Sequence, residues 1–311
     1  MAFDFDAAVT APFRMQPGLR RMAPGSTQPT PLPPGSRHQR EKLAVLSALW
    51  PQALCMQPGF DPTPALHALC AHAAAEQPQA WAWDGCRAQA VGVSVDETGR
   101  VHQHSAGVFG LGDEVARCLN GLPETWRLAG LLSLSFAEDF AIADADSARI
   151  PWLAVCLPSH WAPETKVGRH FAEVHAPVAD NALLLKASES LLKLVTGSER
   201  WERFVWTVTD HPRLNAHPAH VDPVRWPGTR VDRAWLRTEH QTFIPLPERR
   251  QAVFTIHVEL QALAQAAHPP SRAAVLHAAI ATMSPAVLDY RGLATVREPL
   301  LAWLAQRAVL A

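Results

Sequence analysis

The sequence predicts an α+β fold built on a mostly antiparallel sheet. Three segments with strand patterns, 203–210, 232–247 and 252–260, follow one another closely, and a short turn joins the last two. Helical patterns come before and after this group, without a regular alternation of one strand and one helix. Strands and helices segregated in this way are typical of α+β proteins and argue against a doubly wound parallel sheet.

The first half of the chain predicts an extended arm followed by helices and a hairpin. Residues 1–36 are rich in Pro, Gly and Ser, which indicates an N-terminal arm, and we expect residues 37–311 to form a single domain. Charges followed by an apolar stripe predict a helix that ends before Pro51. The elements expected here are helices over 38–50, 63–77 and 113–122, and a hairpin over 87–105 with its turn at 96–100.

The second half predicts the main sheet and its closing helices. An apolar run indicates a buried strand over 150–159, and apolar residues at helical spacing predict a helix over 181–195. The segments 232–247 and 252–260 are expected to pair as an antiparallel hairpin. Two further helices, over 271–283 and 298–310, are expected to close the fold.

Composition and charge exclude several classes of function. The chain has 28 Lys+Arg against 29 Asp+Glu, a net charge of −1, which gives no electrostatic reason to expect a nucleic acid or a membrane surface as partner. The first residues carry acids where a secretory signal has a basic region, and the five cysteines form no CxxC pair. Phosphate-binding glycine motifs and HExxH are absent. We expect a soluble, cytoplasmic protein that binds no nucleotide cofactor itself.

The segment 235–243 is the first candidate for a functional site. Side chains alternate between the two faces of a strand, so Arg237, Glu239 and Gln241 share one face, between Trp235 and Phe243. Such a row can line a polar pocket: arginine pairs with carboxylates or steadies a developing anion, and glutamate holds an amine or relays a proton. The alternative is a solvent-facing ladder in which the charges form a weak surface pair.

The segment 156–178 is the second candidate, because it is a loop-rich connection that carries three histidines. His175 precedes Ala-Pro, so we expect its backbone to be extended and its side chain to project. Imidazole is a common axial ligand of heme iron. The alternative is a histidine that is hydrogen-bonded to the backbone within a packed loop.

Taken in order, several short motifs resemble those of the heme-dependent oxidative N-demethylase catalytic (alpha) subunit family. The resemblance spans most of the chain and is strongest over 155–178. The motifs that carry it are Pro12-Phe13-Arg14, Pro17-Gly18-Leu19-Arg20, the helix around Lys42, VCLPSHWAPETKVGRHFAEVHAPV, WTVTDHP, Arg237-x-Glu239-x-Gln241, Leu246-Pro247, Phe254-Thr255-Ile256 and Tyr290-Arg291-Gly292-Leu293.

This resemblance implies a PAS-like fold that holds heme b. It implies dioxygen-dependent removal of a methyl group from a small secondary methylamine such as dimethylamine, with release of formaldehyde. Electrons would come from separate flavin and iron–sulfur reductase subunits that use NADPH, so the chain would be part of a hetero-oligomer. A PAS-like heme sensor, or a non-catalytic heme-binding or interaction subunit, remains an alternative, because a fold alone does not decide function.

Carried over by position, the resemblance implies roles for four residues around the iron. His175 in the V-H-A-P-V motif would be the proximal ligand of the metal. Arg237 would lie on the distal side and steady dioxygen, and Glu239 and Gln241 would line the same pocket as catalytic residues.

The resemblance implies four further contacts. Lys166 and Arg169 would meet the heme propionates, since a cation beside a buried carboxylate offsets the cost of desolvation. Asp210 would hold the substrate ammonium, with Trp206 as a cation–π wall. Two departures from the family pattern bear on the substrate: His240 stands where the family usually has a second arginine, and the segment 215–231 is long and rich in histidine.

Overall fold

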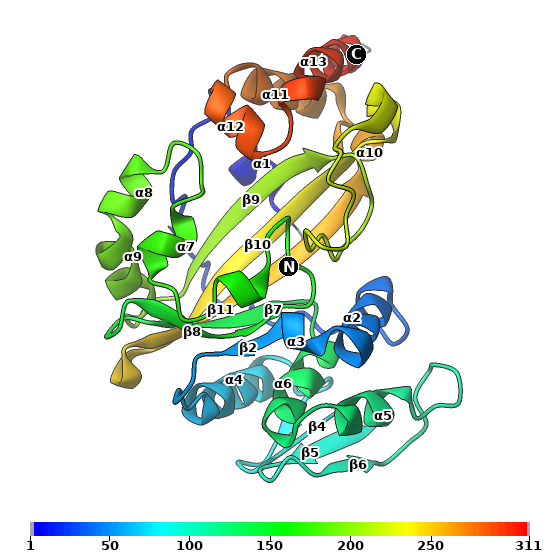
Figure 1. The fold of residues 1–311 in the computed structure, drawn as a ribbon, viewed down its shortest axis with the longest axis vertical. Helices are drawn as coiled ribbons and strands as arrows, with labels where there is room; N and C mark the ends of the chain where they lie inside the picture. The colour runs from blue at the N-terminus through cyan, green and yellow to red at the C-terminus, as the bar shows by residue number, and fades with distance from the viewer. Residues whose placement is uncertain (1–2, 310–311) are drawn as a thin grey trace.

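The centre of the computed structural model is a seven-stranded antiparallel sheet (Figure 1). The structure describes residues 3–309. The strand order is β1-β9-β10-β11-β7-β8-β2, and each neighbouring pair is antiparallel. The predicted α+β class is therefore confirmed. The strands are β1 (Arg20–Arg21), β2 (Leu54–Met56), β7 (Asp139–Asp144), β8 (Arg149–Ala154), β9 (Trp201–Thr209), β10 (Trp235–Leu246) and β11 (Gln251–Ala262).

A second, four-stranded sheet lies at one end of the molecule (Figure 1). It contains β3 (Ala82–Trp83), β4 (Arg87–Ala90), β5 (Val93–Asp96) and β6 (Val101–Gln103). The helix α6 (Glu124–Ser135) contacts β4 and β5 of this sheet and β8 of the larger one, and one apolar core runs through all three layers. The helix α5 (Glu114–Gly121) packs beside α6.

The remaining helices lie around the larger sheet. The short helices α7 (Phe171–His175), α8 (Ala182–Lys186) and α9 (Ser188–Val195) form one group, and α11 (Pro270–Ala281), α12 (Pro285–Tyr290) and α13 (Arg297–Ala308) form another (Figure 1). Among the residues described, no helix is long and apolar enough to cross a membrane. The other helices are α1 (Phe5–Ala8), α2 (Arg37–Ala48), α3 (Trp50–Ala53), α4 (Thr63–Glu76) and α10 (Leu263–Ala266).

Several predicted boundaries were wrong for identifiable reasons. The helix expected over 38–50 ends at Ala48, and Pro51 lies in the first turn of α3, where proline fits because that turn needs no intrahelical N–H donor. The helix expected over 181–195 is two helices, α8 and α9. The strand expected over 150–159 ends at Ala154, and α6 and β7 were not predicted. The predicted end of the last helix, at residue 310, lies outside the described residues.

The N-terminal arm is packed onto the sheet. Phe5, Val9 and Leu32 are buried, and Arg20–Arg21 pairs with β9 as an edge strand. The side-chain amide of Gln28 donates to the Thr242 hydroxyl at 2.9 Å. The arm therefore covers the sheet face that carries the even-numbered residues of β10.

A buried ion pair joins α2 to the main sheet. Lys42 Nζ lies 3.1 Å from Asp139 Oδ1, and the two side chains are 0% and 1% exposed. The same ammonium donates to the carbonyl oxygens of Phe136 and Glu138. Because a buried charge needs direct partners, these contacts fix the start of β7 against α2.

Candidate functional site

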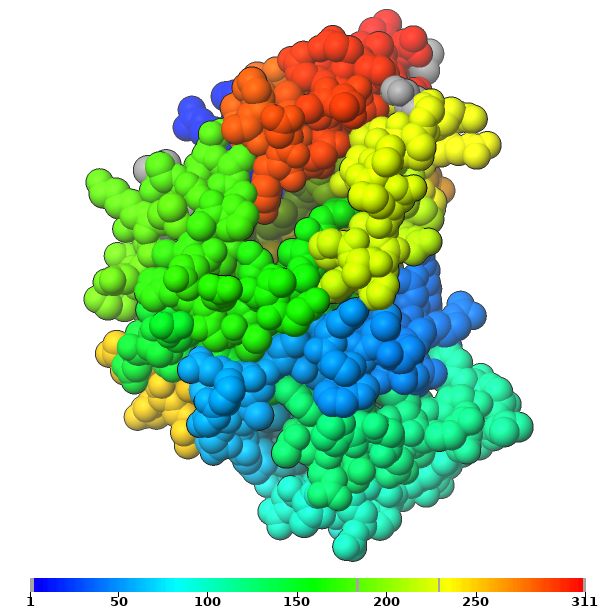
Figure 2. All heavy atoms as spheres, in the orientation of Figure 1, coloured from blue at the N-terminus to red at the C-terminus, as the bar shows by residue number. Residues whose placement is uncertain are grey.

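A hollow opens over one face of the seven-stranded sheet (Figure 2). Figure 2 shows it between the green segment that contains α7–α9, the red-orange segment around α12 and the yellow segment near 210–233. Phe254 packs against residues of the α7–α9 group and stacks on Phe243, which identifies this as the face of β10 that carries odd-numbered residues. The face predicted for Arg237, Glu239 and Gln241 is therefore the face of the hollow.

The register of β9 and β10 places a mixed set of side chains on this face. Arg203 lies opposite Gln241 on the neighbouring strand, and Val205 lies opposite Glu239. Arg203, Val205 and Gln241 remain half-buried, while Glu239 is 9% exposed. The bottom of the hollow therefore offers a cation, an anion, an amide and apolar surface within two adjacent strands.

Arg237 donates its hydrogen bonds within the protein, to four backbone carbonyls and one side-chain hydroxyl. Its guanidinium is 1% exposed, and each of its three nitrogens donates within the protein. Burial lowers the pKa of this arginine to about 10, so it remains charged at neutral pH. Its hydrogen bonds tie two loops to β10. The acceptors are the Ser159 hydroxyl at 2.7 Å and the carbonyls of Leu157, Pro158, Arg213 and Leu214 at 2.8–3.2 Å.

Glu239 and Gln241 are joined to each other. Gln241 Nε2 donates to Glu239 Oε2 at 2.5 Å. The charge of Glu239 acts on Arg203, Arg291 and Tyr290, which places these four side chains near one another. The hollow therefore contains the Arg203 guanidinium and the Glu239 carboxylate on adjacent strands, while Arg291 lies over the rings of Phe13 and Trp206 and acts on them through its charge.

His175 is the last residue of α7, so the expectation of an extended backbone was wrong. A proline restricts the residue directly before it, which here is Ala176 and not His175. The backbone of Ala176 is itself helical, and α7 continues through His175. His175 Nδ1 lies 2.8 Å from the carbonyl oxygen of Phe171, one helical turn earlier. A neutral ring that donates through Nδ1 keeps its lone pair on Nε2, which is the form that binds metals.

The environment of His175 favours the neutral imidazole. Burial lowers its pKa to about 4, and the positive charges of Arg203 and Lys166 add to that effect. The imidazole is therefore uncharged at neutral pH. The charge of Arg203 contributes to this shift, which couples His175 electrostatically to the charged cluster on the sheet face.

The two cations predicted to meet propionates differ in their surroundings. Lys166 is half-buried near His175, and its ammonium donates to the Val174 carbonyl at 3.2 Å. Burial, followed by the charge of Arg169, lowers the pKa of Lys166. Arg169 itself is exposed.

The residues predicted to hold substrate do not join this cluster. Trp206 lies opposite Thr238, so its side chain is on the sheet face away from the hollow, where its indole N–H donates to the Ala8 carbonyl at 3.1 Å. Asp210 accepts from Arg225 Nε at 2.9 Å and from the Trp226 backbone N–H at 2.8 Å.

The pKa of Asp210 reflects these two bonds. Burial raises it, but the hydrogen bond from Trp226 and the charge of Arg225 outweigh burial, and the pKa is lowered overall. The carboxylate therefore anchors the 210–226 segment at the edge of the hollow.

The departure at His240 also faces away from the hollow. His240 Nε2 lies 2.7 Å from Glu202 Oε2, and its ring stacks on Phe204 with centroids 4.6 Å apart. Arg20 of the N-terminal arm donates to the other oxygen of Glu202 at 2.9 Å. His240 therefore belongs to the contact with the arm rather than to the face that carries Glu239.

Sequence reasoning missed Arg203 and the pair formed by His160 and His211. Arg203 was assigned to a strand, but only the register with β10 shows that it lies beside Gln241. The rings of His160 and His211 lie 5.3 Å apart, and each has a buried Nε2 without a hydrogen-bond partner among the described residues. The motif that contains Tyr290 and Arg291 was noticed, without any indication that it reaches the same site.

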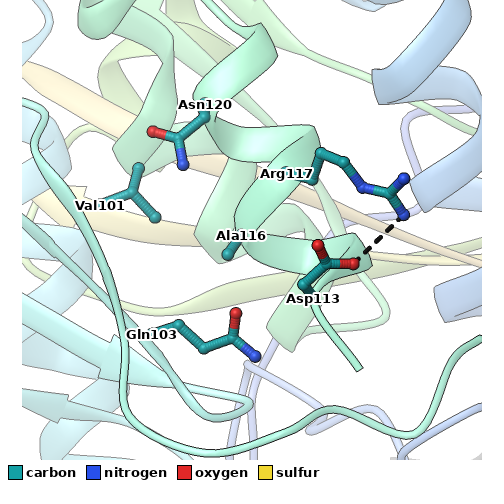
Figure 3. Close-up of a pocket in the computed structure, with 6 residues that line it drawn as sticks. All are labelled: Val101, Gln103, Asp113, Ala116, Arg117 and Asn120. Atoms are coloured by element: carbon teal, nitrogen blue, oxygen red, sulfur yellow. Dashed lines mark ion pairs between the residues drawn. The ribbon is translucent and has the colours of Figure 1, made fainter. Parts of the chain in front are cut away.

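A separate surface depression lies between β6 and α5 (Figure 3). Arg117 lies along one side of this depression and forms an ion pair with Asp113 at 3.3 Å. It belongs to the end of the molecule that carries the four-stranded sheet, away from the hollow (Figure 1). Its lining residues are Val101, Gln103, Asp113, Ala116, Arg117 and Asn120.

Comparison with known families identifies the family of this chain. A family model described as "Haem-dependent oxidative N-demethylase, alpha subunit-like" matches residues 120–301. The match includes α6–α12, β7–β11 and all the residues discussed around the hollow, and it covers more than half of the chain. The description names a heme-dependent oxidoreductase and one subunit of a larger enzyme. The chain belongs to the heme-dependent oxidative N-demethylase alpha subunit-like family.

Proposed function

We propose that this chain is the heme b-binding catalytic subunit of an oxidative N-demethylase. The substrate would be a small secondary methylamine such as dimethylamine. The reaction would consume one dioxygen, two electrons and two protons, and it would release the demethylated amine, formaldehyde and water. The electrons would come from flavin and iron–sulfur reductase subunits that use NADPH. The observation that carries this proposal is the oriented, neutral imidazole of His175 beside the hollow.

The residues present fit heme. His175 offers Nε2 from a ring that the Phe171 carbonyl orients, as proteins commonly arrange for histidine ligands of metals. Among residues 3–309, no three His, Cys, Asp or Glu side chains come together as a metal site. A single histidine suffices for heme, because the porphyrin supplies the other nitrogen ligands. Bound heme b would supply the redox chemistry with dioxygen.

Charged side chains near His175 would hold the cofactor's propionates. Lys166 is half-buried beside the histidine, and Arg169 is exposed close to Lys166 in the chain. We assign Lys166 to the buried part of this contact and Arg169 to its solvent side. A cation at each position would offset the cost of removing a carboxylate from water.

Glu239 is the residue we assign to the amine. Its Oε2 is held by Gln241, which leaves Oε1 to accept the N–H of a methylammonium or to take its proton. Gln241 would orient that carboxylate. Arg237 would act as a positioning residue, because its hydrogen bonds fix the loops at 157–159 and 213–214. Asp210 and Trp206 would act through the surrounding structure, as their contacts with Arg225, Trp226 and the arm indicate.

The arrangement of the sheet supports the PAS-like part of the proposal. The strands β7–β11 form one antiparallel sheet, and the helical insert α7–α9, between β8 and β9, lies over one face (Figure 1). A cofactor held between this insert and the sheet would be shielded from water on both sides. Exclusion of water strengthens each electrostatic contact within such a site.

The proposal is tested by absorption spectroscopy of the purified full-length chain. We expect a Soret band after expression with adequate heme, a spectral shift on titration with dimethylamine, and formaldehyde when an electron donor and dioxygen are supplied. Heme binding without formaldehyde under these conditions would favour a sensor. A chain without a Soret band would contradict the proposal.

A further inference from the structure

Arg203 is an unusual arginine because its charge has no direct partner. Its Nε is buried and donates to no hydrogen-bond acceptor in the part of the chain that the structure describes. Among residues 3–309 the guanidinium forms no ion pair, and Glu239 acts on it only through longer-range charge. Leaving a buried charge without a direct partner is costly, so proteins rarely retain one without a ligand.

The neighbours of Arg203 do not remove this excess of positive charge. Arg291 lies close to it, and the Nε of Arg291 is also buried without a hydrogen-bond partner among the described residues. The other contacts of Arg291 are a hydrogen bond from Nη1 to the Trp206 carbonyl and the aromatic faces of Phe13 and Trp206, 4.8 and 5.5 Å away. Against these two cations stands one carboxylate, Glu239, which Gln241 already engages.

We propose that Arg203 is a carboxylate-binding site at the bottom of the hollow. A guanidinium presents paired N–H donors in a plane, and a carboxylate matches that geometry with two parallel hydrogen bonds. Arg203 is half-buried on the sheet face that lines the hollow, so a ligand there can reach it. The inference rests on the proposed function, because it assigns the ligand of the same site.

The carboxylate can have two sources. One is the substrate: a zwitterionic N-methyl amino acid would place its ammonium at Glu239 and its carboxylate at Arg203. These two residues lie on adjacent strands and face the same surface of the sheet. The register supports this, because Val205, two residues from Arg203, lies directly opposite Glu239. The other source is a propionate of heme, since Arg203 is near enough to His175 for its charge to lower the pKa of the imidazole.

The experiment compares the wild-type chain with Arg203→Met, Arg203→Lys and a control, Arg230→Met. Arg230 is an exposed arginine paired with Asp232 at 2.9 Å, so its replacement removes a guanidinium without altering the hollow. In the first arm, heme-loaded protein is titrated with N-methylglycine and with dimethylamine, and the spectral shift gives each affinity. In the second arm, loss of heme to a scavenger is compared with loss of heme dimethyl ester, which lacks free propionates.

A substrate carboxylate predicts that Arg203→Met weakens N-methylglycine binding by about 10- to 100-fold and leaves dimethylamine binding unchanged, as expected for loss of hydrogen bonds to a charged group. A propionate predicts that Arg203→Met accelerates loss of heme by a similar factor and leaves loss of the dimethyl ester unchanged. In either case Arg203→Lys should give a smaller effect, because lysine keeps the charge but not the paired donors. Equal behaviour of Arg203→Met and wild type in both arms would overturn the proposal.

Stability of the ligand-free chain provides an independent readout. Arg203→Met removes a half-buried charge whose Nε is buried without a partner, so its melting temperature without ligand should equal or exceed that of wild type. A large decrease would show that Arg203 supports the fold, and would count against the proposal.

Failure of the proposed function would be distinguishable from failure of this inference. If the wild-type chain binds no heme, calorimetric titration with N-methylglycine and acetate still compares Arg203→Met with wild type. Binding of either carboxylate that depends on Arg203 would support the inference, and the absence of such binding would contradict it.

Discussion

Replacement of Arg237 by methionine tests whether this residue acts through the architecture of the site. The variant removes five hydrogen bonds and leaves four carbonyl oxygens, on the loops at 157–158 and 213–214, without their donor. A hydrogen bond from a charged donor contributes about 1.5–3 kcal/mol, and each carbonyl left buried without a donor costs about 1–3 kcal/mol, partly offset because the charge of Arg237 no longer has to be buried. We expect the free energy of unfolding to decrease by about 3–5 kcal/mol.

The assay is urea denaturation of the ligand-free chain, followed by tryptophan fluorescence, with Arg230→Met as control. The control should unfold like wild type, because Arg230 and Asp232 form an exposed ion pair. Arg203→Met should be at least as stable as wild type, so two arginines on the same sheet face are expected to respond in opposite ways. If Arg237→Met unfolded at the same urea concentration as wild type, the hydrogen bonds would not support the loops as argued.

Three further predictions concern stability. Lys42→Met should lower the free energy of unfolding by about 3–5 kcal/mol in urea denaturation, because it leaves the buried Asp139 carboxylate unpaired; an unchanged midpoint would contradict this. Asp210→Asn should lower the free energy of unfolding by about 1 kcal/mol, because a neutral acceptor replaces a charged one. The affinity for dimethylamine should stay constant. A selective loss of amine binding would instead support a role of Asp210 in holding the substrate. Burial lowers the pKa of His160 and of His257 to about 3, below the usual value of about 6.5 in an unfolded chain, so their contribution is complete above pH 6.5 and is lost as pH falls towards 3. Denaturation at pH 7, 6 and 5 should show a shallower decrease for a variant with both histidines replaced by glutamine, by about 1 kcal/mol per pH unit for each histidine over this range. An equal slope would count against neutral burial.

The main sheet was predictable because its strands carry a local signal. The alternation along 235–243 identified the face shared by Arg237, Glu239 and Gln241, and the hairpin of β10 and β11 follows from a short turn at 247–250. The helix α6 and the strand β7 were missed. Both are buried almost throughout, so their apolar residues show little periodicity from which a helix or strand could be recognised.

The site was less predictable because it depends on the register between strands. Arg203 and Glu239 are 36 positions apart, and only the pairing of β9 with β10 brings them to the same surface. Arg237 was expected to be free to contact a ligand, because the residue pattern along a strand does not show which loops fold over its side chains. The two loop segments that accept its hydrogen bonds, near 158 and 213, come from different parts of the chain. The resemblance implied Trp206 as a cation–π wall of the site, although the strand turns its side chain to the opposite face.

The most direct test of the central claim is the absorption spectrum of heme-loaded wild type beside His175→Gly, recorded with and without added imidazole. If His175 is the axial ligand, the variant should lose the wild-type Soret and visible bands, and imidazole should restore them by occupying the space that the side chain leaves. His175→Gly with the wild-type spectrum in the absence of imidazole would contradict the account.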